Sequence, residues 1–344
     1  MKKLYLFNIL IIINLKLTQQ YSSFFNNWHC IGISEKINFK SPYKANIGEL
    51  PLVIWKNPKT NHLLSTINIC KHMGSKLDNG VITDDGCLKC QYHGLEMSKK
   101  DEFGKIMEFD GKIFWAYKPI KKEPYRIPFY NDPNYESSYL YIDMDCSLTD
   151  SAYNTMDLRH PEYVHNKLFG FGSIIPPQNV KYYKYNDNQS IGLSFDYSSN
   201  ERMKLLNDNT KKTSNFHMYV YPSFSWSRVS FDDNKKKNIK NLIIGVNLLP
   251  IAEKKTRWYI TIRSNYYKSV YEKKFLKFLT ETILNQDYIQ MKNQYPENDL
   301  KKAILFNHIF NNEEPIIELK KMFQEYRYPD IEQIVKLYED YKKN

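Results

Sequence analysis

The sequence predicts an α+β fold with two antiparallel β regions and helices near the C-terminus. Between Trp28 and Lys118, short apolar or alternating runs are separated by turn-forming residues, which is typical of a small antiparallel β domain. A second β-rich region spans residues 216–264, and long amphipathic helical patterns follow it. With 344 residues, of which 42% are hydrophobic and 15% aromatic, the chain is long enough for two packed domains.

The predicted elements follow one another in a regular order. Strands are expected at 52–55, 63–69, 80–83, 87–90 and 112–117 in the first region, and at 216–231, 241–251 and 257–264 in the second. Helical spacing of apolar residues occurs at 147–165, 270–295 and 316–341. Pro296 is expected to end the second of these helical segments, because proline cannot continue the hydrogen-bond pattern.

Residues 1–24 are predicted to be a hydrophobic targeting leader. Lys2 and Lys3 precede twelve mainly apolar residues, 4–15, and a polar stretch follows. The apolar run is shorter than the roughly 20 residues that a membrane-spanning helix needs. A removable leader is therefore the first prediction. A membrane-associated anchor stays open as the alternative, because no clear small-residue cleavage site follows.

The net charge of +11 suits either an acidic partner or a solvated, lysine-rich surface. The basic residues occur in short runs such as 235–237, not in a helix-long stripe interleaved with aromatics, so we do not predict nucleic-acid binding. None of the 12 glycines builds a G-x-G-x-x-G or P-loop pattern. We therefore predict no nucleotide or dinucleotide site.

The stretch from Cys70 to Gly94 gathers candidate metal ligands on two arms, Cys70-x-His72 and, seventeen residues later, Cys90-x-x-His93. A zinc finger of the Cys2His2 type would pair the two cysteines on one arm and the two histidines on the other. Here each arm offers one thiolate and one imidazole. This order suits a 2Fe–2S cluster in which both cysteines bind one iron and both histidines bind the other. A zinc site with the same four ligands is the alternative.

The remaining cysteines and histidines lack such partners. Cys87 forms a C-x-x-C with Cys90, but it lies on the strand that leads into the second arm, outside the pattern. We predict that it is a buried thiol, like Cys30 and Cys146. Four histidines without partner spacing are predicted to be surface or core residues: His29, His62, His217 and His308.

A second set of candidate ligands lies in the helical segment 147–165, as Asn154-x-x-Asp157-x-x-His160-x4-His165. His160 and His165 are more than one helical turn apart, so both can bind one metal only if the helix is distorted between them. Pro161 is expected to cause that distortion. Two imidazoles and a carboxylate with open positions opposite them form the facial triad of non-haem Fe(II) oxygenases.

The two motifs resemble those of the Rieske non-haem iron oxygenases. The pattern C-x-H-x17-C-x-x-H is that family's cluster motif, and Gly74, Leu77, Tyr92 and Gly94 match its usual surroundings. Lys71 departs from the pattern, since Pro or Thr is commoner there. The helical motif resembles the family's mononuclear-iron motif. The resemblance includes the plastid-type pheophorbide and chlorophyllide oxygenases and related ring-hydroxylating oxygenases.

This resemblance implies a domain organisation and two cofactors. Residues 25–125 would form a Rieske domain whose 2Fe–2S cluster is held by Cys70, His72, Cys90 and His93. Residues 126–344 would form a catalytic domain of the helix-grip type, with an antiparallel sheet, C-terminal helices and a mononuclear Fe(II).

The resemblance also assigns roles around the iron. Asp287, in the helical segment 270–295, would complete the triad with His160 and His165. Glu281 is the runner-up, and a solvated helix acid is the alternative for Asp287. In a homotrimer, Asp157 would bridge His93 of one subunit to His160 of the next. Asn154 would lie near the iron without being a strong ligand; a capping or turn role is the alternative for Asp157 and Asn154.

The implied activity is that of an oxygenase. It would use O2, and electrons from an external ferredoxin or reductase, to hydroxylate or otherwise oxidise a small apolar cyclic organic substrate. The alternative is a Rieske electron-transfer protein without oxygenase activity, which would have no use for His160, His165 and Asp287. The leader and the resemblance together favour an organelle, with a plastid first.

Overall fold

The computed structural model describes residues 24–165, 176–185, 189–198, 212–231, 239–294, 314–324 and 326–342. The chain divides into two compact units, residues 1–124 with 325–344 and residues 125–324. The part of the predicted helical segment 316–341 that follows residue 324 thus belongs to the first unit, whereas the sequence places it in the second domain. The predicted leader lies outside the described residues except for Phe24, which is buried in the first unit.

None of the helices that the structure describes has the length and apolar character needed to cross a membrane.

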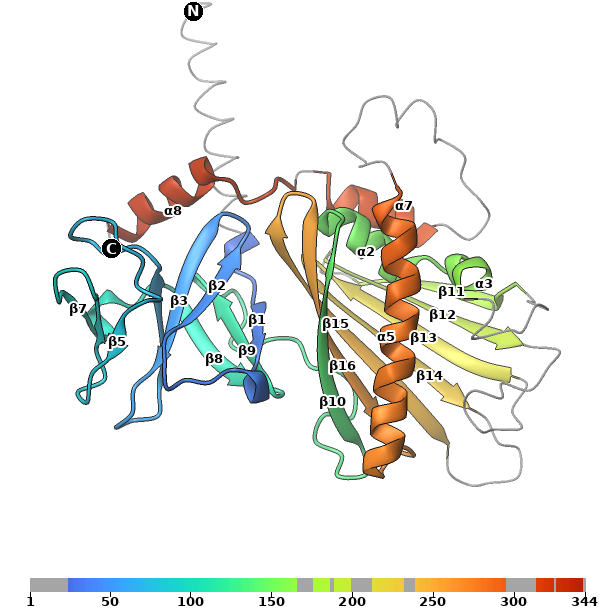
Figure 1. The fold of residues 1–344 in the computed structure, drawn as a ribbon. Coiled ribbons are helices and arrows are strands. Elements are labelled where there is room, and N and C mark those ends of the chain that lie inside the picture. Colours follow the sequence, from blue (N-terminus) through green and yellow to red (C-terminus); the bar gives the residue numbers. More distant parts are fainter. Residues whose placement is uncertain are drawn as a thin grey trace, which may run out of the picture. The chain divides into compact units, whose positions relative to one another are not determined.

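The first unit contains three small antiparallel sheets (Figure 1). Their strand orders are β1 (His29–Ile33), β9 (Lys112–Ala116), β8 (Lys105–Phe109); β2 (Tyr43–Ile47), β3 (Leu50–Lys56), β4 (Leu63–Ile67); and β5 (Val81–Ile82), β6 (Leu88–Lys89), β7 (Glu96–Met97). The described part of this unit also contains two 3₁₀ helices, η1 (Ser34–Lys36) and η2 (Lys99–Asp101), and the C-terminal helix α8 (Ile331–Lys342).

The core of the first unit contains both cysteines of the first motif. Cys70 and Cys90 pack in one cluster with the fully buried Trp55, Leu77 and Leu88. The indole N–H of Trp55 donates to the carbonyl of Gly86 at 3.0 Å, so its one polar atom is satisfied inside the core. The two arms of the motif therefore start from a rigid, well-packed base.

The second unit is built on a seven-stranded antiparallel sheet. Its order is β10 (Glu136–Met144), β16 (Lys255–Ser264), β15 (Lys240–Ala252), β14 (Phe224–Phe231), β13 (Lys212–Val220), β12 (Ser190–Ser198) and β11 (Gln178–Lys184). Strands β11 to β16 pair with their neighbours in sequence, so the sheet is a meander to which β10 adds an edge strand. Figure 1 shows the long helix α5 (Val270–Lys292) lying across this sheet.

Within the described residues, three shorter helices accompany the sheet: α2 (Leu148–Met156), α3 (His160–Val164) and α7 (Glu314–Met322). Ser147 caps α2 by accepting the N–H of Asp150, and Ser269 with Glu272 forms a capping box at the start of α5. Helix α5 ends at Lys292, ahead of Pro296, which lies outside the described residues. Strands β10, β11 and β12 were not predicted from the sequence.

The predicted α+β architecture is confirmed. The first part of the chain forms small antiparallel sheets, and the second forms a large antiparallel sheet with helices that follow it in sequence.

His29, the first residue of β1, is fully buried. Its Nε2–H donates to the carbonyl of Phe24 at 2.9 Å, and its other ring nitrogen has no partner in the described chain. Burial lowers the pKa of His29 to about 4, although the bond to Phe24 raises it. The folded state therefore holds a neutral ring.

We predict that His29 makes the fold sensitive to acid. The pKa of His29 in the folded state lies below the ordinary 6.5. The contribution of the neutral ring to the free energy of unfolding is therefore fully present above pH 6.5 and is lost as the pH falls towards 4. A shift of this size corresponds to about 3 kcal/mol. His29→Gln keeps an N–H donor and removes the titration, so its unfolding free energy should fall less over this range. Parallel pH profiles in urea-unfolding experiments would contradict the prediction.

Candidate metal centres

The two arms of the Cys/His motif form loops with the same backbone hydrogen bonds. In each, the N–H of the glycine four residues after the cysteine donates to the cysteine carbonyl: Gly74 to Cys70 at 2.9 Å and Gly94 to Cys90 at 3.0 Å. Each cysteine N–H donates to the carbonyl five residues on, at 2.7 and 2.9 Å. Both glycines have positive φ, 74° and 78°, which residues with a side chain rarely adopt. The sequence thus builds two nearly equivalent clamps.

The ligand side chains of the two loops form an inner and an outer pair. Cys70 and Cys90 are buried, and their thiols are hydrogen-bonded to each other. His72 and His93 are exposed at the loop tips, with ring centroids 4.6 Å apart. Two sulfurs inside and two imidazoles outside match the donor set of a 2Fe–2S cluster whose irons are bound by different residue types. The residues present therefore fit such a cluster.

The environment of Cys90 favours its thiolate. Burial raises the pKa of this thiol, but hydrogen bonds from the backbone N–H groups of Tyr92 and His93, and from Cys70 and Ser75, lower it by more, so the pKa lies below its ordinary value. The thiolate is the form that binds metal.

Side chains outside the motif hold the first loop in place. The side-chain Oδ1 of the buried Asn68 accepts the backbone N–H groups of Leu77 and Asp78, both at 2.8 Å. Lys71, the residue that departs from the usual family pattern, donates to Asp101 of η2 at 2.6 Å. This contact connects the first loop to η2.

The other three cysteines are free thiols outside this constellation. Burial raises the pKa of Cys30 and of Cys146 to about 12, so both remain protonated and unreactive at neutral pH. Cys87 is only half-buried, although the sequence predicted a buried thiol.

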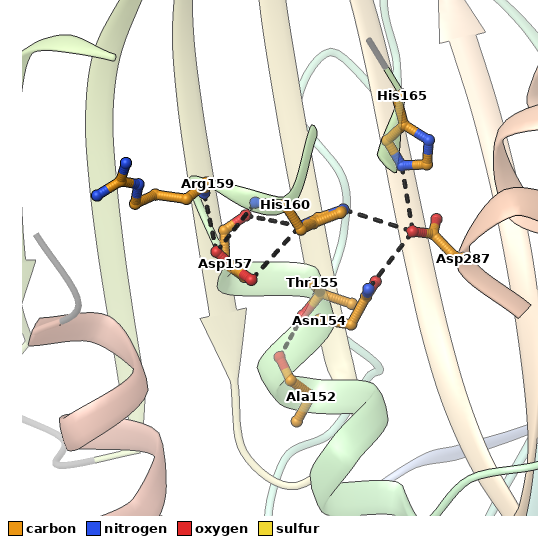
Figure 2. A network of polar contacts seen from close by, with 8 residues as sticks. All are labelled: Ala152, Asn154, Thr155, Asp157, Arg159, His160, His165 and Asp287. Atoms are coloured by element: carbon orange, nitrogen blue, oxygen red, sulfur yellow. Dashed lines mark hydrogen bonds and ion pairs between the residues drawn. The ribbon is translucent and has the colours of Figure 1, made fainter. Parts of the chain in front are cut away.

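A second constellation forms in the other unit, where three side chains converge (Figure 2). Nε2 of His160 lies 3.5 Å, and Nε2 of His165 lies 3.1 Å, from Oδ1 of Asp287 on α5. One ligand atom from each residue lies within 4.8 Å of the other two. Donors about 2.1 Å from one metal ion are separated by distances of this order. The three residues therefore fit one ion.

Hydrogen bonds fix the tautomer of both rings. Nδ1 of His160 lies 3.0 Å from the backbone carbonyl of Asp157, and Nδ1 of His165 lies 2.8 Å from Oε1 of Gln286. Because these oxygens only accept, each Nδ1 carries a proton, and Nε2 is the atom of each ring that faces Asp287 and could bind an ion. Both rings are thus oriented as ligands by residues that do not bind the ion.

The pKa values of the two rings move in opposite directions. Burial lowers the pKa of His160, against the opposing influence of Asp287 and Asp157. Burial also lowers the pKa of His165, but its bonds to Asp287 and Gln286 raise it by more. The buried carboxylate of Asp287 therefore favours the protonated, positively charged form of His165.

The backbone reaches this geometry differently from the expectation. Helix α2 ends at Met156, and α3 begins at His160 with Pro161 in its first turn. The break thus precedes His160, and the prediction that Pro161 distorts the helix between the two histidines is wrong. A proline in the first turn has no hydrogen bond to lose. His165 leaves helical geometry as the C-cap of α3, with ψ of 18°, and this brings its ring back towards α5.

The remaining candidates lie around the triad. The Asn154 amide donates to Oδ1 of Asp287 over a long 3.5 Å. Glu281, the runner-up for the third ligand, is exposed on α5 and is not part of the three-residue cluster.

Asp157 caps the end of α2 and faces partly outwards. Its Oδ1 accepts the backbone N–H groups of Arg159 at 2.8 Å and of His160 at 3.3 Å, while Oδ2 stays 3.9 Å from the His160 ring. Its side chain is 37% exposed. The contact with the His160 ring therefore runs through the main-chain carbonyl of Asp157, not through its carboxylate.

Sequence reasoning missed Gln286 and His217. Gln286 directly precedes Asp287, but nothing in the local pattern marks its contact with His165. His217 was treated as an ordinary histidine, yet it lines a cavity beside the triad and lies near enough to His160 for their charges to interact. Burial lowers the pKa of His217 to about 4, so its ring is neutral at neutral pH. Both contacts depend on tertiary structure.

Comparison with known protein families identifies the first constellation. Residues 27–111 match the Rieske [2Fe-2S] domain. Over 162 residues the chain is 28% identical to the oxygenase component of dicamba O-demethylase from Stenotrophomonas maltophilia, covering 41% of this chain and 47% of that protein. Over 177 residues it is 22% identical to the chloroplastic pheophorbide a oxygenase of Oryza sativa subsp. japonica, covering 42% and 34%. These matches thus span less than half the length of either relative.

Solved structures extend the likeness to both units. Dicamba monooxygenase bound to dicamba matches with a TM-score of 0.71 at 17% identity, over 87% of this chain and 96% of that one. NdmA of Pseudomonas putida CBB5 with caffeine matches with a TM-score of 0.69 at 15% identity, over 90% and 92%. These structural matches establish a shared fold.

We predict that Gln286 controls metal affinity in the second constellation. Gln286→Leu leaves the Nδ1–H of His165 without its acceptor, and losing such a partner commonly weakens binding about 10–100-fold. Gln290→Leu, one turn further along the exposed side of α5, is the matched control. Chelator competition for Fe(II) or Co(II) measures the affinity, with the cluster content followed separately. Equal affinities for the two variants would rule out this role.

Proposed function

We propose that this chain, a relative of the Rieske non-haem iron oxygenases, is itself an oxygenase that oxidises a small apolar cyclic substrate. The observation that carries the proposal is the convergence of His160, His165 and Asp287 in a chain that also has a Rieske domain. The alternative, a Rieske electron carrier, does not account for a triad whose two imidazole rings are held in place by hydrogen bonds to the Asp157 carbonyl and to Gln286.

In this proposal the cluster is held by Cys70, His72, Cys90 and His93. The two buried thiols bind the inner iron, and the two exposed imidazoles bind the outer one. The outer histidines sit at the surface of the first unit, where electrons can enter or leave.

The iron site consists of His160, His165 and Asp287, with Asn154 beside the carboxylate. An Fe(II) ion held by these residues would supply the O2 chemistry of an oxygenase, with electrons from the external donor. The chain's own residues do the positioning: Gln286 and the Asp157 carbonyl hold the Nδ1 protons, so that both Nε2 atoms point at the ion. Three protein ligands leave further positions open for O2 and for the approach of substrate.

Asp157 is proposed to connect the two centres between subunits of a homotrimer. Its main-chain carbonyl accepts from the His160 ring and its Oδ1 from the His160 backbone N–H, while the partly exposed Oδ2 is available to accept a hydrogen bond from His93 of a neighbouring subunit. A single aspartate would then contact a ligand of each centre, one through its main chain and one through its side chain.

The partners follow from the same proposal. Electrons come from an external ferredoxin or reductase, and the net charge of +11 suits an acidic donor. We place the protein in an organelle, with a plastid favoured, because the N-terminal sequence has the pattern of a leader and one relative is chloroplastic. As an addition to this proposal, the leader associates the protein with a membrane.

The function is tested by product analysis under 18O2. The full chain, a reducing ferredoxin system and candidate cyclic compounds should yield a product carrying one or two 18O atoms. His160→Ala should abolish the product while keeping the low-temperature EPR signal of the reduced cluster, because the two centres share no ligand. If His160→Ala lost both, or if wild type with an intact cluster and iron oxidised none of the compounds, the proposal would fail.

A second prediction concerns Asp157. Asp157→Asn retains the main-chain carbonyl that orients His160, so iron should stay bound. The amide nitrogen replaces an acceptor with a donor on the exposed side, which should slow oxidation of the reduced cluster about 10–100-fold. Asp150→Asn, the same exchange in the first turn of α2, is the control. Stopped-flow measurements with substrate and O2 that gave equal rates for both variants would refute the bridge.

A further inference from the structure

A cavity of about 190 Å³ lies between the sheet of the second unit and α5. Its sheet side is made of cross-strand rows with one side chain from each strand, because alternate residues of a strand face the same side. One row joins Phe195, Asn215, Val229 and Leu242. The helix side is made of α5 residues with helical spacing: Leu276, Leu279, Thr280 and Ile283.

The cavity lies directly beside the iron triad. Ile283 lines it, and Asp287 follows one helical turn later on the same side of α5. Asp157 and Pro161, which flank His160 in sequence, also line it. None of the three triad residues lines the cavity itself, but a molecule held here would lie on the same side of α5 as Asp287.

The polar groups of the cavity are concentrated on β13. Thr213, Asn215 and His217 alternate along that strand and all face the cavity. The Asn215 amide nitrogen is already bound to Thr213 Oγ1 at 3.0 Å, which leaves its carbonyl oxygen as the available acceptor. Tyr197, across from Thr213 on β12, has a buried hydroxyl without a hydrogen-bond partner in the described chain. Among the polar groups that line the cavity are thus the Tyr197 hydroxyl as a donor and the Asn215 amide oxygen as an acceptor.

The charge around the cavity is negative. Among the described residues that line it there is no lysine or arginine, and Asp157 is the one ionisable acid. A second carboxylate, Glu162, interacts electrostatically with the hydroxyl of Tyr197. An organic anion would lose its hydration here, and none of the described lining residues would supply a counter-charge, so it would depend on the ion of the triad alone. An uncharged molecule bears no such cost.

The volume limits the size of the occupant. An apolar cavity of about 150 Å³ lined by Leu, Ile and Phe accommodates benzene. At about 190 Å³, this cavity accommodates one six-membered ring with a small substituent. A tetrapyrrole is several times larger.

We infer that the substrate is an uncharged single-ring molecule with one small hydrogen-bonding group, seated between β13 and α5 with that group towards Tyr197 and Asn215. This inference rests on the proposed oxygenase function, which it narrows by charge and by size. The inferred substrate differs in charge from carboxylates and in size from tetrapyrroles.

The test is a binding experiment on the full chain with matched probes, under anaerobic conditions so that no turnover occurs. Benzamide and benzoate have nearly the same shape and differ in charge. Protoporphyrin dimethyl ester is uncharged and differs in size. Titration calorimetry and saturation-transfer NMR should show benzamide binding at least about 10-fold more tightly than benzoate, and no binding of the ester at this site.

Two variants locate the site. Leu279→Trp fills the cavity and should abolish benzamide binding, whereas Ile289→Trp, on the exposed side of the same helix, should leave it unchanged. Ser227→Lys introduces a cation into the cavity wall and should shift the preference from benzamide towards benzoate. The second variant keeps the test valid if Leu279→Trp fails to fold.

The inference is overturned if benzoate binds wild type as tightly as benzamide, if the porphyrin ester binds in a manner sensitive to Leu279→Trp, or if no probe binds. These outcomes are separable from failure of the proposed function. A chain that binds benzamide but oxygenates nothing refutes the oxygenase and leaves the site intact. A chain that oxygenates an anion or a tetrapyrrole refutes the site and leaves the oxygenase intact.

Discussion

The buried carboxylate of Asp287 is the constraint on which the second unit depends. It is 6% exposed, and a carboxylate removed from water is strongly destabilising unless other groups compensate for its charge. Compensation comes from His160 and His165, which are more than 120 residues earlier in the chain, and from the Asn154 amide. To bring these groups together, α5 must lie across the sheet with one side facing inwards. The same placement forms one wall of the cavity, so the proposed metal site and the proposed substrate site have a common structural origin.

The first unit holds the four candidate cluster ligands in two different environments. Two loops with equivalent hydrogen bonds place two thiols in the core and two imidazoles at the surface. The inner pair is held by packing against Trp55 and Leu77, and the outer pair is free to meet a partner. A rigid base and an accessible tip are what an electron-transfer centre needs, because the ligands must keep their geometry while the outer ligands contact another surface.

The sequence predicted those parts of the molecule that depend on local spacing. The two Cys/His arms and the histidine pair could be recognised because their ligands lie within 25 residues of one another. Asp287 needed the family resemblance, since one acidic residue in a long helix carries no local mark. The positions of Gln286 and of the β13 residues Thr213, Asn215 and His217 could not be predicted. Their contacts arise from strands and helices that meet only in the folded chain. The assignment of α8 to the first unit has the same cause: Tyr341 packs on Phe103, more than 200 residues away.

The central claim is that one chain carries two distinct iron centres, a mixed-ligand cluster and a mononuclear ion. The most direct test is the Mössbauer spectrum of the full chain reconstituted anaerobically with 57Fe and sulfide. The account predicts two inequivalent cluster irons and, at half their amount, a separate high-spin Fe(II) that is lost in Asp287→Ala. A spectrum with cluster irons alone, or with two equivalent irons of all-thiolate character, would contradict it.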